Sequence, residues 1–200
     1  MTSPSSPSPD ASLHITKRRL LDVGLATLLE RGYNATGIQD LLVATSVPKG
    51  SFYHHFASKE ALLRAGLQVA LDGLFEVLDD PAANTGSPAQ RLRYIVAAQV
   101  AVLQRELPYV TLLLRVRGNT ETERWALEQR RAFDGRVSAL VREAVEAGEL
   151  RAGLDPTLAA RLLSGLVNSV AEWYRPGRPG GAAVPETVAD AVFAGILPAS

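Results

Sequence analysis

Five consecutive residues, Phe52–Phe56, read FYHHF and bring three aromatic and two histidine side chains into one short stretch. Successive residues of a helix lie about 100° apart around its axis, so one helix cannot bury all five. Phe52 and Phe56 are only about 40° apart, which predicts that both pack into a core, with His55 towards the same side. The opposite face then carries small and hydrogen-bonding residues: Gly50, Ser51, Tyr53 and His54.

This predicted polar face has the chemistry of a nucleic-acid contact. Lys49 adds a cation to the first turn, and no acidic residue occurs between Asp40 and Glu60. Lys59 begins the following helix, where a cation opposes the helix dipole unless an anion binds there. Hydroxyl, imidazole and ammonium groups donate hydrogen bonds to phosphates and base edges. We therefore expect this surface to bind DNA.

Two other kinds of site are weighed against this interpretation. A metal site at His54-His55 would need further ligands, but the two imidazoles diverge by about 100° and His14 is the only other histidine. An enzyme could use Ser51 as a nucleophile beside the histidines, but the acid-free stretch has no carboxylate to orient the base. No catalytic motif occurs elsewhere. We expect no enzyme activity, no metal and no cofactor.

Several short helices with recognisable starts must position this face. Thr36 with Gln39 three residues later predicts a capping box that starts a short helix. Pro48 is predicted to open the helix that bears the polar face, and Ser58 to cap a long fourth helix. A short helix, a tight turn and a second short helix form a helix-turn-helix, whose second helix enters the DNA major groove.

The whole chain is predicted to be all-α, with three parts. Its 200 residues are 46% apolar, its 21 Lys and Arg balance 21 Asp and Glu, and it has no cysteine, which fits a reducing cytoplasm. The Ser/Pro-rich residues 1–13 are expected to be a disordered tail. Residues 14–74 form the expected DNA-binding domain and residues 75–200 a larger helical bundle. No apolar run is long enough to cross a membrane, so a membrane partner is not expected.

The run TGIQDLLVATSVPKGSFYHHFASKEALL resembles the DNA-binding module of the tetracycline-repressor (TetR) family over about residues 14–74. The resemblance implies a transcriptional regulator, most often a repressor, that binds a palindromic operator in double-stranded DNA. It also implies a set of DNA-contacting positions, with Thr36 as a phosphate-contacting cap: Thr36, Gly37, Ser46, Pro48, Lys49, Gly50, Ser51, Tyr53, His54 and Lys59. Ser46 stands where the family usually has glycine, and Leu42 where it usually has alanine. Both departures concern the geometry of the turn between the two helices.

Further helices are expected over residues 89–106, 109–116, 121–147, 156–174 and 185–197. The resemblance implies that the last two form a homodimer interface and that the middle ones enclose a pocket for a hydrophobic effector. The segment EWYRPGRPG resembles regulators of lipid catabolism, which suggests a fatty acid or an acyl-CoA thioester. Polar residues interrupt the apolar runs, without being assigned to a ligand: Gln99, Thr111, Arg115 and Asn168. An activator, or a ligand-binding protein that does not read DNA, remains an alternative.

Overall fold

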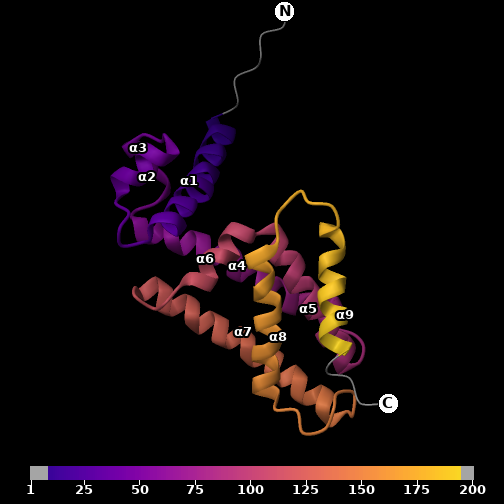
Figure 1. Cartoon of the computed structure of the whole chain (residues 1–200). Helices are drawn as coiled ribbons and strands as arrows, with labels where there is room; N and C mark the ends of the chain where they lie inside the picture. The colour runs from indigo at the N-terminus through magenta and orange to yellow at the C-terminus, as the bar shows by residue number, and fades with distance from the viewer. Residues whose placement is uncertain (1–8, 195–200) are drawn as a thin grey trace, which may run out of the picture. The chain divides into compact units, whose positions relative to one another are not determined.

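The computed structural model of the chain describes residues 9–194, and the side chains of residues 16–193. Every regular element in this part is helical, as the sequence predicts (Figure 1). The first helix, α1 (Pro9–Arg31), begins inside the stretch expected to be a tail, because Pro9 and Asp10 suit a first helical turn. Residues 1–8 of that expected tail lie outside the described residues. No described helix is long and apolar enough to span a bilayer.

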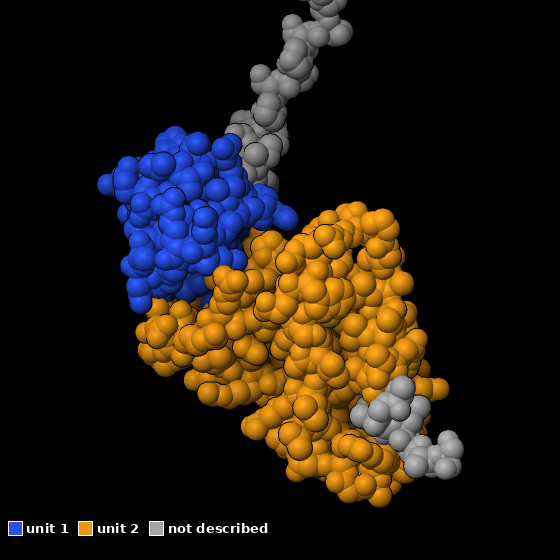
Figure 2. All heavy atoms as spheres, viewed as in Figure 1, with its two compact units in different colours: residues 1–68 blue, residues 69–200 orange. Residues whose placement is uncertain are grey.

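The described chain divides into two compact units, one ending at Gln68 and the other beginning at Val69 (Figure 2). The division falls inside one continuous helix, α4 (Lys59–Asp79), a few residues before the boundary expected from the sequence. The first unit contains α1, α2 (Ile38–Thr45), α3 (Lys49–His55) and the start of α4. In it α1 packs against both α2 and α3, so the short helices share one core.

The core of the first unit is built around fully buried side chains from each of its helices: Leu20, Leu25, Leu41, Phe52 and Leu62. Phe56, just beyond the end of α3, is buried as well, so both aromatic residues predicted to be core are in the core. Gly24 allows α1 to approach α4, since a Cβ there would lie 3.1 Å from Leu62 Cδ2. This core leaves the opposite face of α3 free.

The turns between these helices depend on two left-handed residues. Gly32, with φ of 87°, ends α1 as predicted. Ser46 ends α2 with φ of 54° and ψ of 33°, a conformation in which a side chain is strained. The glycine usual in the family at this position would not be strained in this conformation. Pro48 is the residue before the first helical residue of α3, rather than the first residue itself.

The predicted capping box at Thr36 is wrong. Gly37 is the N-cap of α2, and the Asp40 carboxylate accepts a 2.7 Å hydrogen bond from the Gly37 N–H. Thr36 is buried, and its hydroxyl donates to the Gly32 carbonyl at 2.8 Å. The sequence pattern favoured the wrong start, because Thr36 and Gln39 match the capping-box pattern, whereas Gly37 has no side chain and is bonded only through Asp40.

The second unit is a helical bundle around α5 (Pro88–Arg105), which packs against α7 (Glu121–Glu146), α8 (Pro156–Trp173) and α9 (Val184–Ala194). A shorter helix, α6 (Leu107–Arg115), joins α5 to α7. These helices start and end within two residues of their predicted bounds, except that the expected end of the last helix lies outside the described residues. Two short 3-10 helices were not predicted, η1 (Pro81–Asn84) and η2 (Gly181–Ala183).

Side-chain caps fix the ends of these helices. Asp155 accepts a 2.6 Å hydrogen bond from the Leu158 N–H, as the Asp-Pro pair before α8 predicts. The start of α7 is capped by Thr120, whose hydroxyl accepts the Glu123 N–H at 3.2 Å, and the Glu123 side chain is only 6% exposed. One of its carboxylate oxygens accepts three loop N–H groups, those of Arg117, Gly118 and Asn119, at 2.8–2.9 Å. A single carboxylate oxygen therefore binds three consecutive N–H groups of the α6–α7 loop.

Candidate nucleic-acid interface and ligand cavity

The outward face of α3 is the first candidate site. Gly50, Tyr53 and His54 are exposed and Ser51 is half-buried, whereas Phe52 on the opposite side is fully buried. The Tyr53 ring packs edge-on against Phe52 with centroids 5.4 Å apart, which orients its hydroxyl end away from the core. A Cβ at Gly50 would meet nothing within 4 Å. The polar face predicted from the helical period is therefore present.

Lys49 gives this face an available cation. It is exposed, and among the described residues its ammonium has no hydrogen-bond or ion-pair partner. The nearest acid before α3 in the sequence, Asp40, is already occupied by the Gly37 N–H and lies 4.0 Å from Arg31. Residues 16–64 carry seven lysines and arginines against four acids, although the whole chain is neutral. The first unit is thus locally basic, which suits a polyanion.

His55 differs from its neighbour His54. Its Nε2 atom is buried without a hydrogen-bond partner among the described residues. Burial lowers the pKa of the His55 imidazole, and the charges of His54 and Lys17 act in the same direction. No group of three or more His, Cys, Asp or Glu residues in the described chain is arranged to hold a metal ion.

Two predicted DNA contacts are turned inward instead. Thr36 is buried as described above. Lys59 donates from Nζ to the carbonyl oxygens of Tyr33 and Thr36, at 2.6 and 2.7 Å, and lies 4.1 Å from the centroid of the Tyr33 ring. Its ammonium therefore holds the α1–α2 loop in this structure. The N-terminus of α4 is capped as predicted, because Ser58 Oγ accepts the Ala61 N–H at 3.0 Å.

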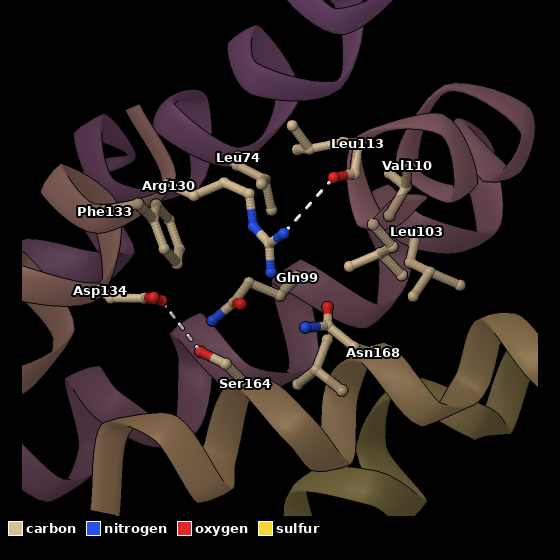
Figure 3. A pocket seen from close by; sticks show the side chains of 12 residues that line it. Leu74, Gln99, Leu103, Val110, Leu113, Arg130, Phe133, Asp134, Ser164 and Asn168 are labelled. Carbon is tan, nitrogen blue, oxygen red and sulfur yellow. Dashed lines mark hydrogen bonds between the residues drawn. The ribbon is translucent and has the colours of Figure 1, made fainter. Parts of the chain in front are cut away.

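The second candidate site is a small cavity inside the second unit, here called the inner cavity, with a volume of about 40 Å³. Figure 3 shows polar groups from α5, α7 and α8 converging on it from apolar walls. It is lined by one residue of α4 and by residues of α5, α6, α7 and α8: Leu74, Gln99, Leu103, Val110, Leu113, Leu114, Arg130, Phe133, Asp134, Ser164, Val167 and Asn168.

Arg130 projects into the inner cavity, where its Nη1 donates to the Leu113 carbonyl at a long 3.4 Å (Figure 3). Asp134, one turn further along α7, accepts a 3.1 Å hydrogen bond from the Ser164 hydroxyl of α8. Burial raises the pKa of the Asp134 carboxyl, against the lowering effects of that hydrogen bond and of nearby arginines. The cavity thus combines a loosely held cation, a half-buried acid and apolar walls, as small-molecule sites do.

Both parts of the chain match known protein families. Residues 20–65 match the family described as "Bacterial regulatory proteins, tetR family", and residues 85–197 match the "Tetracyclin repressor-like, C-terminal domain".

The chain belongs to the TetR family.

Its relatives in the TetR family include named regulators. The "HTH-type transcriptional repressor KstR2" of Rhodococcus jostii strain RHA1 is 30% identical over 94% of this chain and 92% of that protein. The "Transcriptional regulator AcuR" of Cereibacter sphaeroides is 37% identical over 76% of this chain and 72% of that protein. A crystal structure of SCO3833, a TetR regulator from Streptomyces coelicolor A3, is 47% identical with a TM-score of 0.84, over 98% of this chain and 94% of that one. This chain is accordingly a DNA-binding, ligand-responsive transcriptional regulator.

The α3 motif could be recognised locally in the sequence, but the inner cavity could not. Gln99 and Asn168 line the cavity, whereas Thr111 and Arg115, the other polar residues noted in apolar runs, do not. Arg130, Asp134 and Ser164 were missed. The only signal for Arg130 and Asp134 is that they share one side of α7 with Phe133, at spacings of three and four residues.

Proposed function

We propose that this protein is a repressor that binds a palindromic operator as a homodimer and releases it when a hydrophobic effector enters the inner cavity. The observation that supports DNA reading most directly is the outward face of α3. Its exposed donors surround Lys49, which has no partner among the described residues, and its aromatic side is fully buried. This is the arrangement expected of a recognition helix in the major groove.

The proposed DNA contacts follow from exposure. Seven of the residues expected from the family motif are on or beside the outward face and not engaged in the core: Ser46, Pro48, Lys49, Gly50, Ser51, Tyr53 and His54. Gly37 is exposed, but its N–H is already bonded to Asp40. We assign Thr36 and Lys59 a supporting role, since they hold the α1–α2 loop through hydrogen bonds within the first unit.

Homodimerisation through α8 and α9 is supported by an apolar stripe on α8. Leu158, Leu162 and Leu166, four residues apart, are 50–59% exposed, and Trp173 continues the stripe at 52%. Gly165 lies in the same helix, and a Cβ there would meet nothing within 4 Å. A helix-interior glycine is about 1 kcal/mol less favourable than alanine, so the packing of one chain gives it no purpose. Close approach of a second chain at this face would give Gly165 a purpose.

Coupling between effector and DNA is proposed to run along α4. This helix begins at Lys59, shortly after the recognition helix, and carries Leu74 into the wall of the inner cavity. An effector that favours a different α4 position would shift the spacing of the two recognition helices, which fit half-sites roughly 34–36 Å apart. A coupling of about 1–3 kcal/mol would lower operator affinity roughly 5- to 150-fold.

The test is fluorescence anisotropy of the purified protein on duplex DNA from upstream of its own gene, across a salt series. We expect tight, selective and salt-sensitive binding that Tyr53→Phe weakens and that the Lys49→Ala, His54→Ala double variant abolishes. Arg142→Ala is the matched control, because it removes an exposed cation of α7 in the second unit.

If the wild type bound a scrambled duplex as tightly as the upstream duplex, the protein would not recognise an operator in that upstream region. Loss of binding in the Arg142→Ala control would show that general charge, not the α3 face, holds the DNA.

A further inference from the structure

The junction of α1 and α3 brings three nitrogen-bearing side chains together: Lys17, His54 and His55. The two helices pack against each other in the first unit (Figure 1). The rings of His54 and His55 lie edge-on, with centroids 5.1 Å apart. Lys17 and His54 are exposed, whereas His55 is half-buried. Because His54 also belongs to the outward face of α3, this junction borders the candidate DNA surface.

Lys17 lies on the side of α1 that packs into the core of the first unit. It precedes Leu20 and Leu21, both buried, by three and four residues, and this spacing places all three on one side of the helix. The charge of Lys17 acts on the imidazole of His55, which is the last residue of α3. Arg19 is also exposed, but it lies about 200° from Lys17 around the helix axis. Lys17, rather than Arg19, therefore faces α3.

No acid of the described chain neutralises this cluster. The charges that act on His55 are those of His54 and Lys17, and no carboxylate is among them. The helix α3 contains no acid. Asp22, the first acid of α1 whose side chain is described, is bonded to Arg18 at 3.0 Å. The junction therefore gathers positive charge that described carboxylates do not balance.

His55 also has a nitrogen that the described chain leaves unsatisfied. Its Nε2 atom is buried and has no hydrogen-bond partner among the described residues. Burial lowers the pKa of the His55 imidazole, and the charges of His54 and Lys17 lower it further. The imidazole is therefore neutral in the free protein at neutral pH. An anion beside Lys17 and His54 would offset two of these three causes.

A DNA duplex on the outward face of α3 would supply such an anion. Phosphates line both strands, and lysine and imidazole groups beside a recognition helix are suited to bind them. A phosphate near Lys17 and His54 would raise the pKa of His55 in the complex above its value in the free protein. Between those two values the complex binds more protons than the free protein, so a falling pH favours the complex.

We propose that a DNA phosphate binds at the α1–α3 junction, on Lys17 and His54, and that His55 takes up a proton when it binds. Affinity for DNA then rises as the pH falls through the range in which histidine titrates. This deepens the proposed function and rests on it, because it assumes that α3 faces DNA. If no phosphate reached the junction, acid would charge a half-buried imidazole beside two cations, and binding would weaken instead.

Fluorescence anisotropy of the whole chain on duplex DNA, at constant ionic strength from about pH 8 to about pH 6, tests the coupling, since histidine changes charge in this range. We expect the Kd for DNA to fall about threefold or more, within the limit of about tenfold per pH unit for each proton taken up. His55→Gln should remove this pH dependence, because glutamine does not titrate. His54→Gln should weaken binding and retain a pH dependence. His14→Gln is the matched control, since His14 is the only other histidine of the chain.

The phosphate contact has a test of its own in the salt dependence of binding. Lys17→Ala should reduce the salt slope by about one. Arg19→Ala is the matched control, as an exposed cation on the opposite side of the same helix, and should leave the slope unchanged. Thermal melts at both ends of the pH range verify that each variant is folded. Should His55→Gln unfold the first unit, His55→Asn repeats the test with a smaller side chain.

Three results would each overturn the proposal. The first is a wild-type affinity that stays constant or falls as the pH is lowered. The second is a pH dependence that survives His55→Gln, or that disappears with His54→Gln or His14→Gln. The third is an unchanged salt slope in Lys17→Ala.

A scrambled duplex separates this proposal from the broader function, because a phosphate contact carries no sequence information and should give the same pH effect there. Equal binding of the upstream and scrambled duplexes, with the pH effect intact, would contradict the operator proposal alone. Selective binding of the upstream duplex without the pH effect would contradict the coupling to His55 alone. Absence of binding to either duplex would overturn both.

Discussion

The two units of this protein place their functional polar groups in opposite ways. In the first, the candidate DNA contacts come from consecutive residues of one short helix and point outward from a buried aromatic face. In the second, Gln99, Arg130 and Ser164 come from three helices and point inward to one cavity (Figure 3). A polyanion needs an accessible surface, whereas a small apolar molecule needs enclosure. A surface site can therefore be a local motif, whereas an enclosed site is a product of packing.

Removing Phe52, the buried side chain that anchors α3, should have the largest effect on stability. Phe52 is fully buried, so Phe52→Ala should lower the free energy of unfolding of the first unit by about 3–5 kcal/mol. Denaturant unfolding and operator anisotropy measure this, and DNA binding should be lost while the second unit stays folded. Phe52→Leu should lose much less stability. If the second unit unfolded together with the first, the two units would not be independent of each other.

A smaller loss is expected when the α6–α7 loop loses its acceptor. Glu123→Ala leaves three loop N–H groups without the carboxylate, which should lower the free energy of unfolding by about 2 kcal/mol. Glu121→Ala, an exposed acid in the same first turn, is the control and should lose about 0.5 kcal/mol. Thermal melts compare them. Equal losses would mean that the helix dipole, rather than the loop contacts, accounts for the effect of Glu123.

Two lysines sharpen the distinction between holding the fold and touching DNA. Lys59→Ala removes two charged hydrogen bonds and should lower the free energy of unfolding by about 1.5–3 kcal/mol. It should leave the salt dependence of operator binding unchanged. Lys49→Ala should do the reverse, with little change in stability and a salt slope reduced by about one. Should Lys59→Ala also flatten the slope, Lys59 would contact phosphate in the complex, as the family resemblance implied.

The smallest expected change is a gain in the stability of the first unit. Ser46 has φ of 54°, so Ser46→Gly should relieve the strain and stabilise the first unit by about 0.5–1 kcal/mol. Ser51→Gly is the matched control, because Ser51 lies inside α3, and it should destabilise by about 0.5 kcal/mol. Thermal unfolding of both variants measures the difference. Destabilisation by Ser46→Gly would show that the left-handed turn is held by something other than backbone conformation.

Most helix bounds followed from caps, glycines and prolines, since these act within a few residues of their own position. The start of α2 is the exception: Gly37 and Thr36 compete for the cap, and burial of Thr36 decided between them. Lys59 is similar. Its place after Ser58 indicated a cation at a helix start, but its carbonyl partners are 23 and 26 residues away in the sequence.

The all-α fold, the helix-turn-helix and the polar face of α3 follow from the sequence alone, because the period of a helix places side chains without reference to the rest of the chain. The inner cavity and the inward role of Lys59 follow only from the folded structure. Each of these depends on groups from separate segments meeting in space, and that meeting is set by how the core packs rather than by any local pattern.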